Sequence, residues 1–84
     1  MNSLPSAVFL DRDGTIIEDV HFISRPEQVR LIDGAADAIA RINAVLVPVI
    51  VVTNQSGIGR GIFTETDYNN VNARMTELLS EHGA

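Results

Sequence analysis

One short stretch, an apolar run that ends in two acidic residues, constrains the fold of this chain more than any other. Residues 7–15 read Ala-Val-Phe-Leu-Asp-Arg-Asp-Gly-Thr, so Asp11 and Asp13 directly follow an apolar segment. Such a segment predicts a short buried strand, and a strand that ends here presents both carboxylates at the carboxyl edge of a sheet. Ligands bind at that edge in open α/β sheets. Side chains two residues apart in an extended segment share a face, so both carboxylates are expected to point toward one bound group.

The aspartate pair also indicates a chemistry. Two carboxylates so close together repel each other, and a divalent cation between them relieves that repulsion. Mg²⁺ fits, because it binds one or two carboxylates together with phosphate oxygens. An aspartate can also act as a nucleophile that forms an acyl phosphate, with the second carboxylate as proton donor. We therefore predict Asp11 and Asp13 as catalytic residues and as magnesium ligands; the alternative is a surface turn, because Asp-Gly is a common turn signal.

A second polar cluster follows a second predicted strand. Residues 45–52 are nearly all β-branched, which is typical of a strand buried on both faces, although Pro48 places its start at or just after that residue. Hydroxyl, amide and main-chain N–H groups after the strand are predicted to bind a phosphate, with an ordinary polar loop as the alternative. Arg60, in a glycine-rich segment, is expected to hold a second anionic group; the alternative is a flexible loop. The predicted substrate-binding residues are Thr53, Asn54, Gln55, Ser56 and Arg60.

Two helices are predicted, one between the strands and one after them. Apolar residues recur at helical spacing from 35 to about 43, with Asp33 as the expected N-cap. The second helix begins near Thr64, because Thr64 and Asp67 resemble a capping box, and Gly83 ends it. Its apolar face is expected to belong to a core or an interface: Tyr68, Val71, Met75, Leu78, Leu79 and His82. The lone histidines, His21 and His82, are expected to be structural or exposed, with substrate contact left open for His21.

The order of these elements predicts the fold class. Strand, helix, strand, helix indicates an α/β fold with parallel strands joined by right-handed crossovers. So few strands and helices do not close a core, because parallel sheets normally have both faces covered. We therefore predict a Rossmann-like parallel sheet with flanking helices, with residues 1–84 as one partial domain, the first half of a larger one.

The amino-acid composition limits the kinds of partner that this chain is expected to bind. The chain has no cysteine, which excludes disulfides and thiolate metal sites. Its net charge of −5 disfavours a nucleic-acid surface, which needs clustered basic residues. The longest apolar run is about half a membrane span, and nothing at the amino terminus resembles a signal peptide. We expect a soluble cytoplasmic protein with a small phosphorylated substrate and neither nucleic acid nor membrane as partner; composition carries no signal for an oligomeric state.

Two motifs taken together resemble those of a known family. Asp-Arg-Asp-Gly-Thr at 11–15 and Thr-Asn-Gln-Ser-Gly at 53–57 resemble the motifs of haloacid dehalogenase-like phosphatases. The exact residues of both motifs are similar to those of one subgroup, which contains the D-glycero-D-manno-heptose 1,7-bisphosphate 7-phosphatases and the histidinol-phosphate phosphatases. The resemblance extends from about residue 7 to residue 84, the N-terminal half of that domain.

The resemblance implies roles for individual residues. Asp11 would be the nucleophile, and Asp13 would protonate the leaving sugar oxygen and then activate water. Mg²⁺ would be held by the Asp11 carboxylate and the Asp13 carbonyl, and Thr53 and Asn54 would hold the transferring phosphoryl group. Residues 19–22 occupy the place where the heptose phosphatases contact substrate.

The family also uses groups that this chain lacks. A later Lys or Arg balances the phosphoryl charge, a later acidic residue completes the magnesium site, and the heptose enzymes carry a Cys/His zinc loop after the second helix. We therefore expect a truncated phosphatase that is inactive or nearly so alone. The preferred substrate is the heptose bisphosphate, because Arg60 could meet a second phosphate; histidinol phosphate is the near alternative.

Two more distant alternatives remain. A polynucleotide 3′-phosphatase has a similar second motif, but the net negative charge of this chain disfavours a nucleic-acid substrate. A non-catalytic fragment that serves as an interaction module is the alternative from another class, in which the helix face at residues 68–79 would be an exposed apolar patch.

Overall fold

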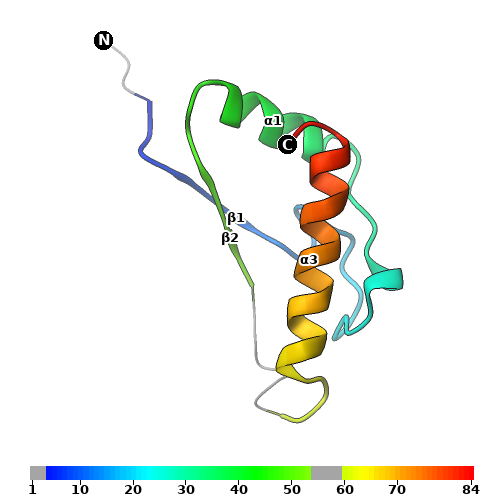
Figure 1. Cartoon of the computed structure of the whole chain (residues 1–84). Coiled ribbons are helices and arrows are strands. Elements are labelled where there is room, and N and C mark those ends of the chain that lie inside the picture. Colours follow the sequence, from blue (N-terminus) through cyan, green and yellow to red (C-terminus); the bar gives the residue numbers. More distant parts are fainter. Residues whose placement is uncertain (1–3, 54–59) are drawn as a thin grey trace.

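The computed structural model describes residues 4–53 and 60–84. Five elements follow one another in this part of the chain (Figure 1). They are β1 (Val8–Asp11), the 3₁₀ helix η1 (Pro26–Gln28), α1 (Ala35–Ala44), β2 (Val49–Val52) and α3 (Glu65–Glu81). The predicted order of strands and α-helices is confirmed. No helix of the described residues is long and apolar enough to cross a membrane.

The two strands form a parallel sheet, as predicted. Val8 pairs with Val49 at one end of the sheet, and Asp11 pairs with Val52 at the other. β2 begins directly after Pro48, in agreement with the missing N–H of proline. Because both strands run in the same direction, their carboxyl ends lie together at one edge, which places Asp11 and the residue after Val52 side by side.

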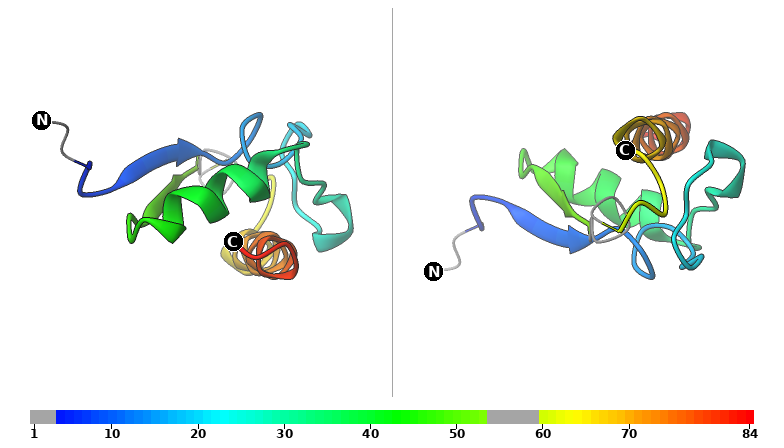
Figure 2. Two further views of the ribbon diagram at one scale, coloured as in Figure 1. Left: turned by 90° about the horizontal axis from the view of Figure 1, so that it is seen from above. Right: turned by 90° about the horizontal axis from the view of Figure 1, so that it is seen from below.

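Alternate residues of each strand face opposite sides of this sheet. Leu10, Val49 and Val51 pack against the buried core, whereas Phe9, Ile50 and Val52 are 66%, 43% and 47% exposed. The core joins residues of the loop after β1 to residues of both helices, so α1 and α3 cover the same face of the sheet (Figures 1 and 2). Its main members are Ile16, Ile17, Ile23, Val29, Ala36, Ile39, Val71, Met75 and Leu79.

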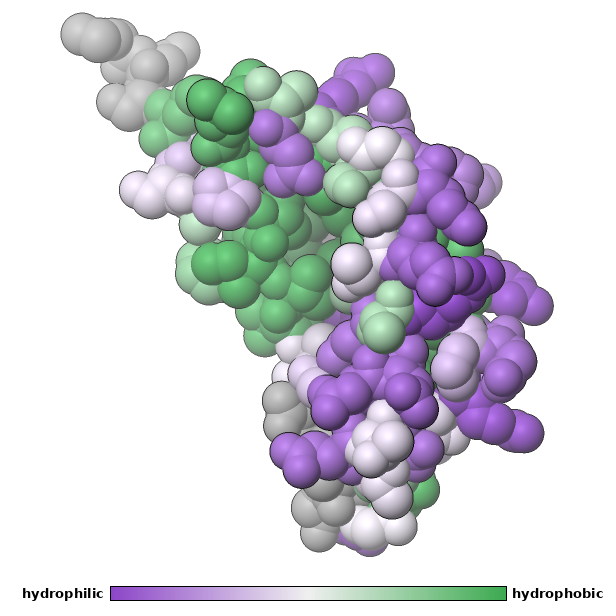
Figure 3. Space-filling model, viewed as in Figure 1, coloured by the Kyte–Doolittle hydropathy of each residue, from purple (hydrophilic) through white to green (hydrophobic). Residues whose placement is uncertain are grey.

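The sheet therefore carries exposed apolar side chains, whereas the apolar face of the second helix is buried. The interaction-module alternative placed an exposed apolar patch at residues 68–79, and this prediction is wrong, because Val71, Met75 and Leu79 are at most 9% exposed. Figure 3 shows the hydrophobic residues gathered over the strands, while the solvent-facing side of α3 is hydrophilic. The helix spacing correctly identified a buried face, and the two-stranded sheet has too few layers to cover its own second face.

The helix termini confirm one predicted cap and correct another. Thr64 caps α3: its Oγ1 accepts from the Asp67 N–H, and its own N–H donates to Asp67 Oδ2, each at 3.0 Å. Gly83, with φ of 86°, follows the C-cap of α3, as predicted. Asp33 as N-cap of α1 is wrong. The N-cap is Gly34, whose φ of 84° is a left-handed conformation that glycine adopts without steric cost.

Candidate active site

The carboxyl edge of the sheet holds the acidic and hydroxyl residues that the sequence singled out. A pocket of about 250 Å³ is lined by Asp11, Asp13, Val52 and Thr53. Asp11 ends β1 and Thr53 directly follows β2, so the register of the parallel pair brings them to one place. The predicted proximity of Asp11 and Thr53 is therefore seen in the fold, while the chemical role of each residue stays a prediction.

A tight turn after β1 brings Asp13 to this edge. The Arg12 carbonyl accepts hydrogen bonds from the N–H groups of Ile16 and Ile17, at 2.9 and 3.0 Å. Gly14 has a φ of 82° and donates its N–H to the Ile17 carbonyl at 2.8 Å. Since this backbone conformation is unfavourable for residues with a Cβ, the glycine allows the chain to fold back while Asp13 remains at the pocket.

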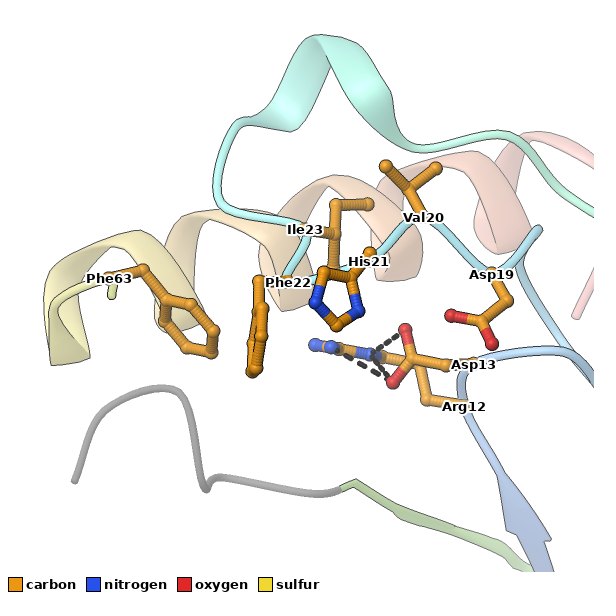
Figure 4. Close-up of a pocket in the computed structure, with 8 residues that line it drawn as sticks. All are labelled: Arg12, Asp13, Asp19, Val20, His21, Phe22, Ile23 and Phe63. Atoms are coloured by element: carbon orange, nitrogen blue, oxygen red, sulfur yellow. Dashed lines mark hydrogen bonds and ion pairs between the residues drawn. The ribbon is translucent and has the colours of Figure 1, made fainter. Parts of the chain in front are cut away.

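The residue between the two aspartates is part of the site, although the sequence did not predict a role for it. Arg12 is 2% exposed, and charged side chains are rarely buried unless they are paired. Its Nε donates to both carboxylate oxygens of Asp13 at 3.3 Å, and its Nη2 lies 3.2 Å from Asp13 Oδ2 (Figure 4). The aspartate pair predicted a metal ion as the positive group beside it. The structure adds a cation of the chain itself, for which the placement of a basic residue between two acidic residues is the signal in the sequence.

Helix α3 supports the same arginine. Arg12 Nη1 donates to Asn72 Oδ1 at 2.7 Å, and the guanidinium carbon lies 5.6 Å from the centre of the Tyr68 ring, within reach of a cation–π interaction. The Tyr68 hydroxyl is in turn 2.5 Å from Thr53 Oγ1. Sequence spacing gave Tyr68 a core or interface role, and it did not identify Asn72 at all, because an isolated asparagine on a helix carries no functional signal.

A second pocket adjoins the first through Asp13. It has a volume of about 280 Å³ and is lined by Arg12, Asp13, Asp19, Val20, His21, Phe22, Ile23 and Phe63 (Figure 4). The predicted substrate-contact segment, residues 19–22, thus lines a cavity. Phe22 has a φ of 51°, an uncommon conformation for a bulky residue. Its ring lies 4.2 Å from the His21 ring and 6.5 Å from the Phe63 ring, measured between centroids.

The remaining predicted residues divide into three groups. Arg60 is exposed, and its guanidinium carbon lies 5.9 Å from the centre of the Phe22 ring, so it borders the second pocket without being one of its lining residues. Asn54, Gln55 and Ser56 lie outside the described residues. His82 is the exposed C-cap of α3, which agrees with its expected role, and His21 is an exposed residue that lines the second pocket.

The donor set of the first pocket fits magnesium bound together with phosphate. Within residues 4–53 and 60–84, no group of three or more His, Cys, Asp or Glu side chains is arranged to hold a metal ion. Two carboxylates do line the pocket, and Mg²⁺ usually takes one or two carboxylates, with phosphate and water completing its shell. The Asp13 carboxylate faces Arg12, so this pairing does not compete with the Asp13 main-chain carbonyl, the ligand implied by the family resemblance.

Comparison with solved structures defines the class of protein. A structure from Mesorhizobium loti, described as a haloacid dehalogenase-like phosphatase, matches with a TM-score of 0.89 and 49% identity, over 93% of this chain and 37% of that one. A D,D-heptose 1,7-bisphosphate phosphatase from B. bronchiseptica, complexed with magnesium and phosphate, matches with a TM-score of 0.86 and 32% identity, over 95% and 45%. Over the part that it spans, this chain is similar in fold and sequence to these haloacid dehalogenase-like phosphatases.

Sequence comparison points to one subgroup within that class. A D-glycero-beta-D-manno-heptose-1,7-bisphosphate 7-phosphatase of Mesorhizobium japonicum is 49% identical over 77 residues, which are 92% of this chain and 36% of that protein. The chain spans 36–52% of the length of the first curated relatives that it matches, all heptose bisphosphate phosphatases by name. No family model matches the chain. The predicted resemblance is confirmed.

Proposed function

We propose that this chain carries the phosphoryl-transfer site of a magnesium-dependent phosphomonoesterase that acts on a small sugar phosphate. One observation carries the proposal: Asp11, Asp13 and Thr53 line a single pocket at the carboxyl edge of a parallel sheet. An acidic nucleophile, a second carboxylate and a hydroxyl are the groups that phosphate transfer through an aspartyl phosphate requires. The names of the relatives support the same reaction class.

The reaction divides into two displacements at phosphorus. In the first, a carboxylate oxygen of Asp11 attacks the phosphorus atom and the bond from phosphorus to the sugar oxygen breaks. Asp13 enters this step protonated, gives its proton to that oxygen, and leaves the step as the carboxylate that pairs with Arg12. In the second, Asp13 takes a proton from water, the water oxygen attacks the aspartyl phosphate, and inorganic phosphate leaves with Asp11 restored. The Thr53 hydroxyl donates to a phosphoryl oxygen during both steps.

Magnesium and the remaining phosphate-binding groups complete the site. Mg²⁺, held by the Asp11 carboxylate and the Asp13 carbonyl, would offset the negative charge that gathers on the phosphoryl oxygens. Asn54, Gln55 and Ser56 would add donors from the segment after Thr53, and this assignment remains a prediction. The cytoplasmic location expected from the sequence is likewise a prediction.

The two adjoining pockets suggest the kind of substrate. The smaller pocket would take the reacting phosphate, and the larger one, about 280 Å³ in volume, would take the body of a small sugar. Arg60, beside Phe22 at its border, would pair with a second phosphate. These features favour D-glycero-D-manno-heptose 1,7-bisphosphate, the substrate named for the curated relatives.

Phosphate release from a chimera tests the proposal. In the chimera, this chain replaces the aligned 77-residue segment of the Mesorhizobium japonicum protein, because the chain alone spans 36% of that protein. We expect the chimera to release phosphate from the heptose bisphosphate when Mg²⁺ is present, and we expect Asp11→Asn to lower the rate by about 10⁴-fold or more. The matched control is Asp37→Asn, an exposed aspartate on α1.

The same assay separates the alternatives. The 84-residue chain alone is expected to be slower than the chimera by roughly 10⁴- to 10⁶-fold, because two charge-stabilising groups worth about 3–4 kcal/mol each are supplied from outside it. An Asp11→Asn chimera as active as its Asp37→Asn control would refute the nucleophile assignment. A chimera that prefers histidinol phosphate over the heptose bisphosphate would refute the substrate assignment.

A further inference from the structure

We propose that Arg12 and Tyr68 are positioning residues, through which helix α3 fixes the side chains of Asp13 and Thr53 in the orientation used for phosphoryl transfer. The inference rests on the proposed function for its catalytic meaning, but its structural content can be tested separately. It gives a role to the buried charge of Arg12 and to one face of α3, neither of which takes part in the reaction steps above.

The burial of Arg12 is the first observation behind this inference. A guanidinium that is 2% exposed needs partners for its donors, since an unpaired buried charge is very costly. Arg12 finds these partners on two elements: the Asp13 carboxylate beside it and the Asn72 side chain on α3. The arginine therefore links the acidic loop to a helix that is 60 residues later in the sequence.

The second observation is the geometry at Asp13. Three donor–acceptor contacts of 3.2–3.3 Å join the guanidinium to the two oxygens of this carboxylate. A fork of this kind restricts the rotation of the carboxylate as well as its position, because a planar guanidinium offers its donors in one plane. Figure 4 shows the carboxylate lying against the guanidinium. Asp13 lines both pockets.

Thr53 is held by the same helix face. Tyr68 and Asn72 are four residues apart on α3, so they lie on one face of the helix. The ring of Tyr68 stands beside the Arg12 guanidinium, and its hydroxyl is 2.5 Å from Thr53 Oγ1. One helix face thus reaches the side chains that follow both strands, and a path of contacts runs from Asp13 through Arg12 and Tyr68 to Thr53.

The consequence is a site whose reacting groups are held before substrate binds. Misplacement of a reacting group by about 1 Å can lower a rate by about 10²-fold. Arg12→Lys keeps the charge but lacks the planar fork, so it should free the Asp13 carboxylate. Tyr68→Phe keeps the ring beside Arg12 and removes only the hydroxyl, so it should free the Thr53 side chain.

Side-chain rotamers measured by NMR on this chain within the chimera test this inference. Three-bond couplings should show one χ1 rotamer for Asp13 and one for Thr53 in the wild-type chimera. We expect Asp13 to become rotationally averaged in Arg12→Lys and in Asn72→Ala, and Thr53 to become averaged in Tyr68→Phe. The control Arg41→Lys, an exposed arginine on α1, should change neither. Asn72→Ala is included because it leaves both ion-pair partners in place.

In the chimera, Arg12→Lys should lower kcat about 10²-fold and leave KM nearly unchanged, because the change affects alignment and not binding. Averaged Asp13 and Thr53 rotamers in the wild-type chimera, or fixed rotamers in all three variants, would overturn the inference. If the rotamers respond as expected and the wild-type chimera releases no phosphate, the positioning network stands and the proposed function fails.

Discussion

A double-mutant cycle on Arg12 and Asp13 tests whether the buried ion pair is as strongly coupled as its burial implies. Arg12 is 2% exposed and Asp13 is 26% exposed, so the two single substitutions are not equivalent. Asp13→Ala leaves the guanidinium buried without its counter-charge, and a loss of this kind costs about 3–5 kcal/mol. Arg12→Met leaves a carboxylate that water can still reach, so we expect a smaller loss of about 1–2 kcal/mol.

The double variant should reveal the coupling. Asp13→Ala combined with Arg12→Met removes both charges and leaves no buried ion, so its cost should be well below the sum of the single costs. We expect a coupling energy of about 2–3 kcal/mol, at the upper end of what neighbouring residues show.

Urea unfolding followed by far-ultraviolet circular dichroism is the assay. Arg41 and Asp37 supply the matched control, because they form an ion pair whose side chains are 81% and 71% exposed. The coupling of that pair should be about 0.3–0.5 kcal/mol. Additive single substitutions at Arg12 and Asp13, or a coupling no larger than that of the exposed pair, would refute the reasoning from burial.

Four further substitutions test the fold by the same urea assay. Val71→Ala should cost about 2–3 kcal/mol, because the side chain is fully buried, whereas Phe9→Ala, on the exposed sheet face, should cost less than about 0.5 kcal/mol; equal losses would contradict the assignment of the core. Thr64→Ala should cost about 1 kcal/mol through the lost cap, and an unchanged midpoint would argue against the capping box. Gly14→Ala should cost about 1–2 kcal/mol from its φ of 82° alone, since its added Cβ would meet nothing within 4 Å; a stabilised variant would show that this turn is misdescribed.

The sequence predicted the elements that depend on local patterns. The apolar runs before Asp11 and Thr53 gave the two strands and their parallel pairing, since a helix pattern separates them. Thr64 and Asp67 gave the start of α3, because a capping box is a local signal made by two residues three positions apart. The juxtaposition of Asp11 and Thr53 followed from topology alone.

The sequence did not predict contacts between residues that are far apart in the chain, and it did not predict one backbone conformation. Arg12 and Asn72 are 60 residues apart, so nothing in the local sequence indicated that one would receive a hydrogen bond from the other. Asp33 had the right residue type for an N-cap, but the left-handed φ of Gly34 moved the cap by one residue. The apolar face of α3 was correctly recognised, and its burial depended on Ile16 and Ile17, which a loop brings to it.

Binding of beryllofluoride, a phosphoryl mimic that attaches to a reactive aspartate, tests the central claim most directly. The claim is that Asp11 accepts a phosphoryl group in the pocket that it shares with Asp13 and Thr53. In ¹⁹F NMR spectra of the chimera with Mg²⁺, the account predicts a bound beryllofluoride signal that is lost in Asp11→Asn and kept in Asp37→Asn. A bound signal that persists in Asp11→Asn, or a wild-type chimera that shows none at saturating Mg²⁺, would contradict it.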